Sequence, residues 1–211
     1  MPSPKFKYSH LVLIGFQRLR ELKQFYARNY DAPYPSFVKR KTLVSHAYPK
    51  TTWIETGTYM GSTSKYLSKR YPKIVTIEPS ELFFSFATSR LKRSRNIVTL
   101  FGSSEDHFEA ALVGESESVN IWLDGHFSDG GTFLGESVSP IVHELEIIAR
   151  HKFKFHSIRV FVDDVRLFQR DDTHLTGYPP FTSLVDWALS NGFKWEVQND
   201  IFIAKYAKLI H

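Results

Sequence analysis

Strand-like and helix-like segments alternate regularly over most of this chain, and this alternation constrains its fold more than any other feature. Seven strands are predicted, at residues 51–55, 73–77, 96–101, 119–123, 157–162, 193–197 and 201–206. Five helices are predicted between them, at residues 62–70, 81–92, 105–112, 138–150 and 181–190. This order indicates an α/β fold with a doubly wound, mostly parallel sheet that ends in an antiparallel strand.

Two helices are expected ahead of the alternating region. Residues 12–29 and 36–47 have helical patterns, and Pro33 and Pro35 separate them because proline resists a helix interior. Ser36 is expected as the N-cap of the second helix. We therefore divide the chain into a basic helical extension, residues 1–35, and an α/β domain, residues 36–211.

Positive charge is concentrated at the front of the chain. The net formal charge of the 211 residues is +5, yet residues 1–50 hold ten Lys and Arg against only two Asp and Glu. A basic front end favours an anionic partner, and the alternative is a solvated helix face. The aromatic residues among these charges, such as Tyr26 and Tyr30, are expected to form the buried face of the helices. No zinc-finger, RNP or helix-turn-helix pattern supports a nucleic-acid partner.

The composition excludes several kinds of site. The chain has no Cys, so disulfides, thiolate metal sites and a cysteine nucleophile are ruled out. It also has no run of about 18 apolar residues, the length that a membrane span requires. The short apolar stretch at residues 11–16 is followed by charged residues, which does not fit a signal peptide. We expect a cytoplasmic protein without a membrane span.

The first two predicted strands end in residues suited to a nucleoside ligand. Glu55-Thr56-Gly57-Thr58-Tyr59-Met60-Gly61 follows the pattern E-x-G-x-x-x-G, and its glycines allow a tight turn and a close approach of the backbone to a ligand. Glu78 ends the second strand about 20 residues later, where an acid can accept hydrogen bonds from ribose hydroxyls. The alternatives are a turn that only packs helix on strand and a solvated carboxylate.

The third predicted strand ends in Gly102-Ser103-Ser104-Glu105-Asp106. Small hydroxyl residues followed by acids are typical of a helix N-terminus, so Ser103 or Ser104 is expected to cap the next helix. The same residues could also border a flat base, and the two roles are compatible.

Carboxylates follow the fourth and fifth predicted strands. Asp124 emerges after Ile121-Trp122-Leu123, and Asp163-Asp164 emerges after Val160-Phe161-Val162. Carboxylates at adjacent strand ends raise each other's pKa unless a cation neutralises them, and oxygen ligands suit a hard ion such as Mg²⁺. The alternative is helix capping with an ion pair to Arg166. His126 is a candidate ligand, general base or structural residue.

These motifs follow one another in one order: E-x-G-x-x-x-G, I-E, G-S-S-E-D, L-D-G-H and V-D-D. That order resembles class I S-adenosylmethionine-dependent methyltransferases, and more narrowly the metal-dependent O-methyltransferases of the catechol and macrocin types. The resemblance spans residues 36–206. It implies a Rossmann-like methyltransferase fold, S-adenosylmethionine as cofactor, and Mg²⁺ or another divalent cation at the acidic strand ends.

The resemblance also assigns a role to each motif. The implied cofactor-binding residues are Glu55, Gly57, Thr58, Gly61, Thr63, Glu78, Ser103, Ser104, Glu105 and Asp124. Glu55 and the turn Gly57–Gly61 would hold the methionine part, Glu78 would hold the ribose hydroxyls, and the residues 103–105 would border the adenine. Thr63 falls where catechol-type enzymes have a serine, and Asp124 could also face the cofactor from the fourth strand. The implied metal ligands are Asp124, Asp163 and Asp164. Lys39 falls where such proteins often place a helix start beside the cofactor.

The chain departs from the catechol type at three places, one of which is a longer, glycine-rich loop at residues 125–131. Asp163-Asp164 replaces the usual Asp-Asn, as in the macrocin type, and Phe127 stands at the position of the lysine base. The proton of the acceptor would therefore pass to Asp124 or His126, which we expect as catalytic residues, or the metal would make a base unnecessary.

We therefore expect a Mg-dependent O-methyltransferase that acts on a hydroxyl of a small polar acceptor. The expected acceptor is sugar-like or diol-like and could be anionic, and the chain could form a homodimer. Two alternatives stay open: a metal-dependent hydroxylase on the same fold, and a non-catalytic cofactor-binding module with a basic, anion-binding face. A binder of nucleic acid or phospholipid through the basic front end is a further alternative.

Overall fold

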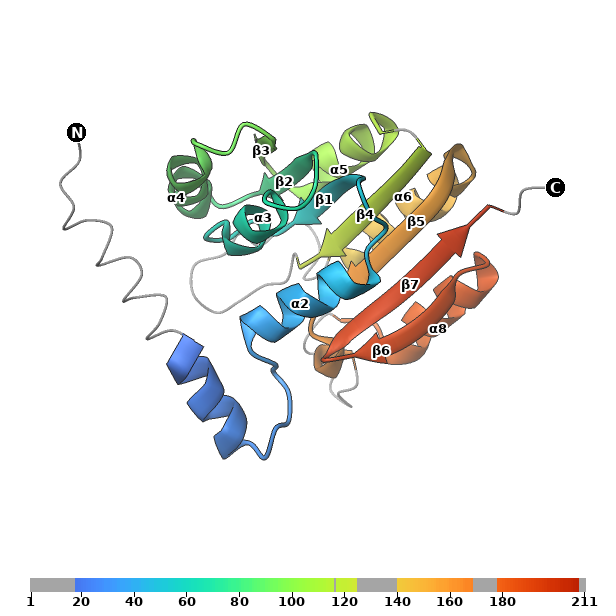
Figure 1. Ribbon diagram of the computed structural model, residues 1–211. Coiled ribbons are helices and arrows are strands. Elements are labelled where there is room, and N and C mark those ends of the chain that lie inside the picture. The colour runs from blue at the N-terminus through green and yellow to red at the C-terminus, as the bar shows by residue number, and fades with distance from the viewer. Residues whose placement is uncertain (1–17, 116, 125–139, 169–177, 209–211) are drawn as a thin grey trace.

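One seven-stranded sheet organises the computed structural model, which describes residues 18–115, 117–124, 140–168 and 178–208 (Figure 1). The strand order is β3-β2-β1-β4-β5-β7-β6. The strands are β1 (Thr52–Thr56), β2 (Ile74–Glu78), β3 (Ile97–Phe101), β4 (Glu117–Leu123), β5 (Phe155–Val162), β6 (Lys194–Gln198) and β7 (Ile201–Ala207). The first five are parallel, and β7 runs antiparallel to both β5 and β6. The predicted doubly wound α/β fold is therefore confirmed.

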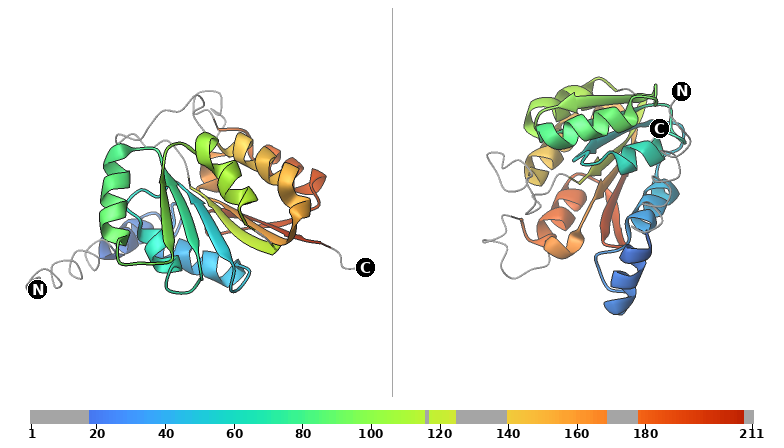
Figure 2. Two further views of the ribbon diagram at one scale, coloured as in Figure 1. Left: turned by 90° about the horizontal axis from the view of Figure 1, so that it is seen from above. Right: turned by 90° about the vertical axis from the view of Figure 1, so that its left-hand side faces the viewer.

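Helices cover both faces of this sheet (Figure 2). The helices from residue 36 onward are α2 (Ser36–His46), α3 (Ser62–Leu67), α4 (Glu81–Leu91), α5 (Ser104–Val113), α6 (Ile141–His151) and α8 (Phe181–Ser190), with short 3-10 helices η1 (Lys152–Lys154) and η2 (Val165–Leu167). Helices α2 and α3 lie on one face, whereas α5, α6 and α8 lie on the other. The strands and helices predicted from residue 36 onward are present, and their ends differ from the predicted ones by a few residues. The two 3-10 helices were not predicted.

Each face of the sheet has its own apolar core. Under α5, α6 and α8 the core includes Phe108, Ile148 and Leu184, all fully buried. On the α2 and α3 side, Trp53 stacks on Phe161 at a centroid distance of 5.3 Å. Coverage of both faces of the sheet explains why β1 and β2 are buried at every position.

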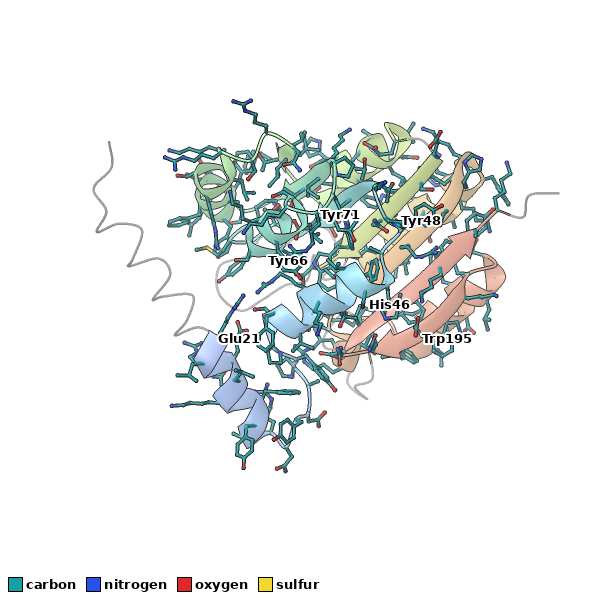
Figure 3. All side chains as sticks on the ribbon, in the orientation of Figure 1. Glu21, His46, Tyr48, Tyr66, Tyr71 and Trp195 are labelled. Carbon is teal, nitrogen blue, oxygen red and sulfur yellow. The ribbon has the colours of Figure 1, made fainter. Side chains whose placement is uncertain are left out.

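A carboxylate in the segment before α2 contacts the first residue of that helix. Residues 18–27 are helical, and Glu21 in this segment faces the start of α2 (Figure 3). The Glu21 carboxylate accepts hydrogen bonds from the backbone N–H and the hydroxyl of Ser36 at 3.0 and 2.9 Å. A carboxylate at this end of a helix is stabilised by the unpaired amides and the helix dipole.

Two expectations for this region are wrong. Pro35, not Ser36, occupies the N-cap position of α2, and the Ser36 hydroxyl forms no cap within its own helix because it donates to Glu21. The aromatic residues of the front segment do not all face the core, since Tyr26 is 69% exposed and Tyr30 is 60% exposed. Within the described ranges, no helix has the length and apolar character needed to cross a membrane.

Candidate functional site

The ends of the parallel strands lie side by side because their hydrogen-bond ladder continues past the last residue of each strand. Gly57 N–H donates to the Ile77 carbonyl at 3.0 Å, and Gly102 N–H to the Glu78 carbonyl at 3.1 Å. In the same way Asp124 N–H donates to Thr56 at 3.1 Å and Asp163 N–H to Leu123 at 3.0 Å. The predicted motifs therefore form one row at the carboxyl edge of the sheet, where doubly wound folds bind ligands.

The turn after β1 uses its glycines as the sequence predicted. Gly57 has φ 84° and Gly61 has φ 66°, backbone conformations that favour glycine. A Cβ atom at Gly61 would also lie 3.0 Å from the Leu91 side chain on α4. Tyr59 lies between them with φ 47°. Its backbone N–H points to the Glu78 carboxylate, at 2.6 Å from Oε2.

Glu55 lies beneath this turn rather than on its surface. Its side chain is almost completely buried and accepts hydrogen bonds from the Ser64 hydroxyl and, at 2.8 Å, from the Thr76 hydroxyl. The Thr76 hydroxyl also bonds to that of Thr58 at 2.6 Å. Burial raises the pKa of Glu55 to about 8, and the two hydroxyl donors oppose that rise. These contacts join the turn to β2 and α3; direct contact of Glu55 with a cofactor stays a prediction.

Glu78 ends β2, which lies between β3 and β1 in the row. Its Oε1 accepts the backbone N–H of Ser80 at 2.9 Å, while Oε2 accepts that of Tyr59. A carboxylate oxygen accepts more than one hydrogen bond, so each oxygen can also accept one from a ribose hydroxyl. Burial raises the pKa of Glu78, and the two backbone donors partly offset this. The structure therefore fixes the Glu78 carboxylate at the end of β2; its contact with a ribose stays a prediction.

The residues assigned to the adenine begin α5. Ser103 is the N-cap, and its hydroxyl accepts the Asp106 N–H at 3.2 Å while the Asp106 carboxylate accepts the Ser103 N–H at 3.3 Å. This capping box confirms the predicted cap. Ser104 is buried and Glu105 is exposed at the same helix start. Their contact with a base, like that of the half-buried Thr63 on α3, stays a prediction.

Asp163 and Asp164 share a cation that belongs to the chain itself. The Lys39 ammonium on α2 lies 2.6 Å from Asp163 Oδ1 and also bonds to Asp164 Oδ1. Asp164 has φ 54°, a left-handed conformation, and its N–H donates to Asp163 Oδ1 at 2.8 Å. Burial alone would lower the pKa of Lys39, but the charges of the two aspartates outweigh burial and raise it. The lysine is therefore a fixed cation.

A second cation completes this cluster. Arg166 in η2 donates to Asp164 Oδ1 at 2.5 Å and to Asp200 Oδ2, and its backbone N–H donates to Asp200 Oδ1 at 2.9 Å. The ion pair to Arg166 considered from the sequence is confirmed. Asp200, which precedes β7, was not predicted. It reaches the carboxyl edge because β7 is antiparallel, so that its first residue meets the last residues of β5.

The carboxylates at this edge do not fit a divalent ion as they stand. Mg²⁺ requires near-octahedral oxygen ligands at about 2.0–2.1 Å, but Oδ1 of Asp163 and Oδ1 of Asp164 are both occupied by the Lys39 ammonium. Nowhere in the described ranges do three Asp, Glu or His side chains gather as a metal site. The expected ligation of Mg²⁺ by Asp124, Asp163 and Asp164 therefore lacks support in this geometry.

A cavity of about 310 Å³ opens beside the cluster, between the segment before α2 and the ends of β4 and β5. Its polar lining includes Gln24, Arg28, Tyr34, Lys39, Asp124 and Asp163. Asp124 and the fixed Lys39 cation thus line one cavity. The predicted base or ligand His126 lies outside the described residues, as does Phe127.

Glu144 on α6 was not predicted, because one acid in an amphipathic helix carries no signal in the sequence. Its side chain is fully buried, and neither carboxyl oxygen has a hydrogen-bond partner among the residues that the structure describes. Burial raises the pKa of Glu144 to about 7. The hydroxyls of Ser104 and Thr56 oppose this rise without reaching normal hydrogen-bond geometry.

Comparison with known proteins establishes the class of fold. No family model matches the sequence, and no relative is found among curated proteins. The chain is similar to an O-methyltransferase from Bacillus cereus in complex with SAH, with TM-score 0.55 and 17% identity over 91% of this chain and 90% of that one.

Two further solved structures have the same fold. A precorrin-6Y C5,15-methyltransferase from Geobacter metallireducens matches with TM-score 0.51 and 15% identity, over 84% of this chain and 91% of that one. A precorrin-8W decarboxylase from Methanobacterium thermoautotrophicum matches with TM-score 0.50 and 15% identity, over 85% and 93%. The chain has the Rossmann-like fold of class I S-adenosylmethionine-dependent methyltransferases.

The buried carboxyl of Glu144 makes the stability depend on pH. Its folded pKa of about 7 exceeds the ordinary 4.5, so the folded state keeps a proton that the unfolded chain releases. Its contribution is complete below pH 4.5 and is lost as the pH rises through the folded value. As the pH rises across this window, the free energy of unfolding of Glu144→Gln should therefore increase relative to that of wild type by up to about 3 kcal/mol. Urea unfolding at a series of pH values measures this difference.

The matched control for this measurement is Glu146→Gln, which changes an exposed acid on the same helix. The difference in free energy of unfolding between this control and wild type should not increase with pH. A flat difference for Glu144→Gln across the same window would contradict the assignment of a buried, proton-holding carboxyl.

Proposed function

We propose that this chain is an S-adenosylmethionine-dependent O-methyltransferase that methylates a hydroxyl of a small polar acceptor. The observation that carries the proposal is the row of strand ends, in which the glycine turn, Glu78, Ser103 and Asp124 lie at one edge of a methyltransferase fold. The complex of the Bacillus cereus O-methyltransferase with SAH supports the choice of cofactor. Because different reactions use this fold, the residues at the edge must support the choice of reaction.

S-adenosylmethionine supplies an electrophilic methyl group when bound, so the protein's task is to align the acceptor and take up its proton. Glu78 would accept the ribose hydroxyls, and the backbone of the glycine turn would lie against the methionine part. Asp124 lies at the end of β4, next to the turn, and faces the cavity beside the cluster. We assign it the role of general base, with His126 as a second candidate in the sequence that follows it.

The cavity beside Lys39 is the place we assign to the acceptor. Its lining combines carboxylates, cations and the ring of Tyr34, which suits a small polyhydroxyl molecule with hydrogen-bonding groups on several sides. Arg28 in this lining donates to the Pro33 carbonyl at 2.7 Å, which fixes its guanidinium at the rim. A sugar or diol-like acceptor, including an anionic one, fits this chemistry. The magnesium ion expected from the sequence has no part in this proposal.

Glu78→Ala tests the cofactor site. Hydrogen bonds to a charged group contribute about 1.5–3 kcal/mol each, so the loss of the ribose contact should weaken binding of S-adenosylhomocysteine by about 10-fold to 100-fold. Isothermal titration calorimetry measures this affinity. Glu81→Gln, which changes an exposed acid at the start of α4, should bind like wild type. The absence of any cofactor binding by wild type would remove the proposal.

Asp124→Asn tests the base. Loss of a general base lowers turnover by about 10²-fold to 10⁴-fold, so transfer of a labelled methyl group to sugars and diols should fall in that range. The affinity for S-adenosylhomocysteine should change little, because Asn keeps the shape of Asp. Asp186→Asn, an exposed change on α8, is the control. Cofactor binding without transfer to any acceptor of a broad panel would instead favour a non-catalytic module.

A further inference from the structure

We propose that the Lys39 ammonium is the resident cation of the carboxyl edge and takes the place that the sequence resemblance assigns to a divalent metal ion. The inference deepens the proposed function, since it concerns the same acceptor site, but its main readout does not depend on methyl transfer. It rests on the geometry of Lys39, Asp163 and Asp164.

The first step is the position of the ammonium. Asp163 and Asp164 follow β5 directly, and the left-handed conformation of Asp164 turns both carboxylates toward one point. Lys39 Nζ is at that point, 2.6 Å from Asp163 Oδ1 and bonded to Asp164 Oδ1. A shared oxygen-lined position between two carboxylates is what a hard metal ion would require. In this chain the Lys39 ammonium occupies that position.

The second step is the burial of the pair. The side chains of Lys39, Asp163 and Asp164 are only 12%, 8% and 8% exposed. Carboxylates so buried must be paired or bind a cation. Arg166 adds a second positive charge on Asp164, so a divalent ion at this position would meet two fixed cations. The local charges therefore disfavour a metal as long as Lys39 is in place.

The third step connects the ammonium to the acceptor. An ammonium has three N–H donors, and two of them are used by Asp163 and Asp164. Lys39 also lines the cavity that we assign to the acceptor, together with Asp124. The remaining donor can thus bond to an acceptor oxygen and stabilise the negative charge that develops there as Asp124 takes the proton. The ammonium would stabilise this negative charge as a single point charge, whereas a metal ion would chelate two hydroxyls.

A Mn²⁺ titration tests the inference directly. Binding is measured as the loss of the electron paramagnetic resonance signal of the free ion. Wild type should leave the signal of added Mn²⁺ unchanged, and so should Lys39→Arg, which keeps a positive charge. Lys39→Met removes the ammonium and keeps the length of the side chain, so it should bind one Mn²⁺ per chain. The double variant Lys39→Met with Asp163→Asn should lose that gained site.

Lys41→Met is the matched control, because Lys41 lies on the same helix and is exposed; it should behave like wild type. One tightly bound Mn²⁺ in wild type would overturn the inference, and so would a folded Lys39→Met variant that binds none. If Lys39→Met does not fold, the wild-type titration alone decides the matter. Calorimetry of S-adenosylhomocysteine binding on the same samples reports the proposed function separately, so that the failure of one does not imply the failure of the other.

Discussion

Neutralising buried carboxylates at one edge of the sheet is the constraint on which the rest of this structure depends. Parallel strands deliver their last residues to the same edge, which brings Asp124 and Asp163 into one row. The antiparallel β7 adds Asp200 to that edge from its other end. Buried charges of one sign are costly unless they are paired. Two cations from different parts of the chain, Lys39 and Arg166, meet this need.

This pairing also explains why α2 lies where it does. Lys39 and Asp163 are 124 positions apart in the sequence, yet their ion pair joins α2 to the end of β5. A second polar contact, from Asn199 Nδ2 to Thr42 Oγ1 at 2.8 Å, holds the same helix to the turn between β6 and β7. Glu21 then fixes the preceding segment on the first residue of α2. The far wall of the cavity that we assign to the acceptor is therefore positioned by a series of polar contacts that begins at the acidic edge.

The sequence predicts much of this molecule because its informative signals are local. The alternation of strands and helices, the glycines of the turn after β1 and the cap at Ser103 each depend on neighbouring residues, and each is confirmed. The ion pair between Lys39 and Asp163 could not be predicted from local signals, because no residue near Lys39 in the sequence indicates that a carboxylate after β5 lies beside it. The exposure of Tyr26 was missed for a similar reason, since helical periodicity identifies an apolar face but not whether another element covers it. The burial of Glu144 was missed for the same reason, because the helical pattern does not show that a polar side chain is covered by other elements.

The nature of the cation changes what the site demands of its other residues. A divalent ion that chelates two hydroxyls lowers the pKa of the acceptor strongly and favours diols. An ammonium has half that charge and acts through one hydrogen bond, so it stabilises a developing oxyanion less and selects less strictly for adjacent hydroxyls. Sugar hydroxyls are weak acids, so under the proposed function a site built around Lys39 would need a base to remove their proton. If Lys39 takes the place of a metal ion as we propose, the acceptor geometry is less restricted, and the proposed role of the Asp124 carboxylate as the base becomes more important.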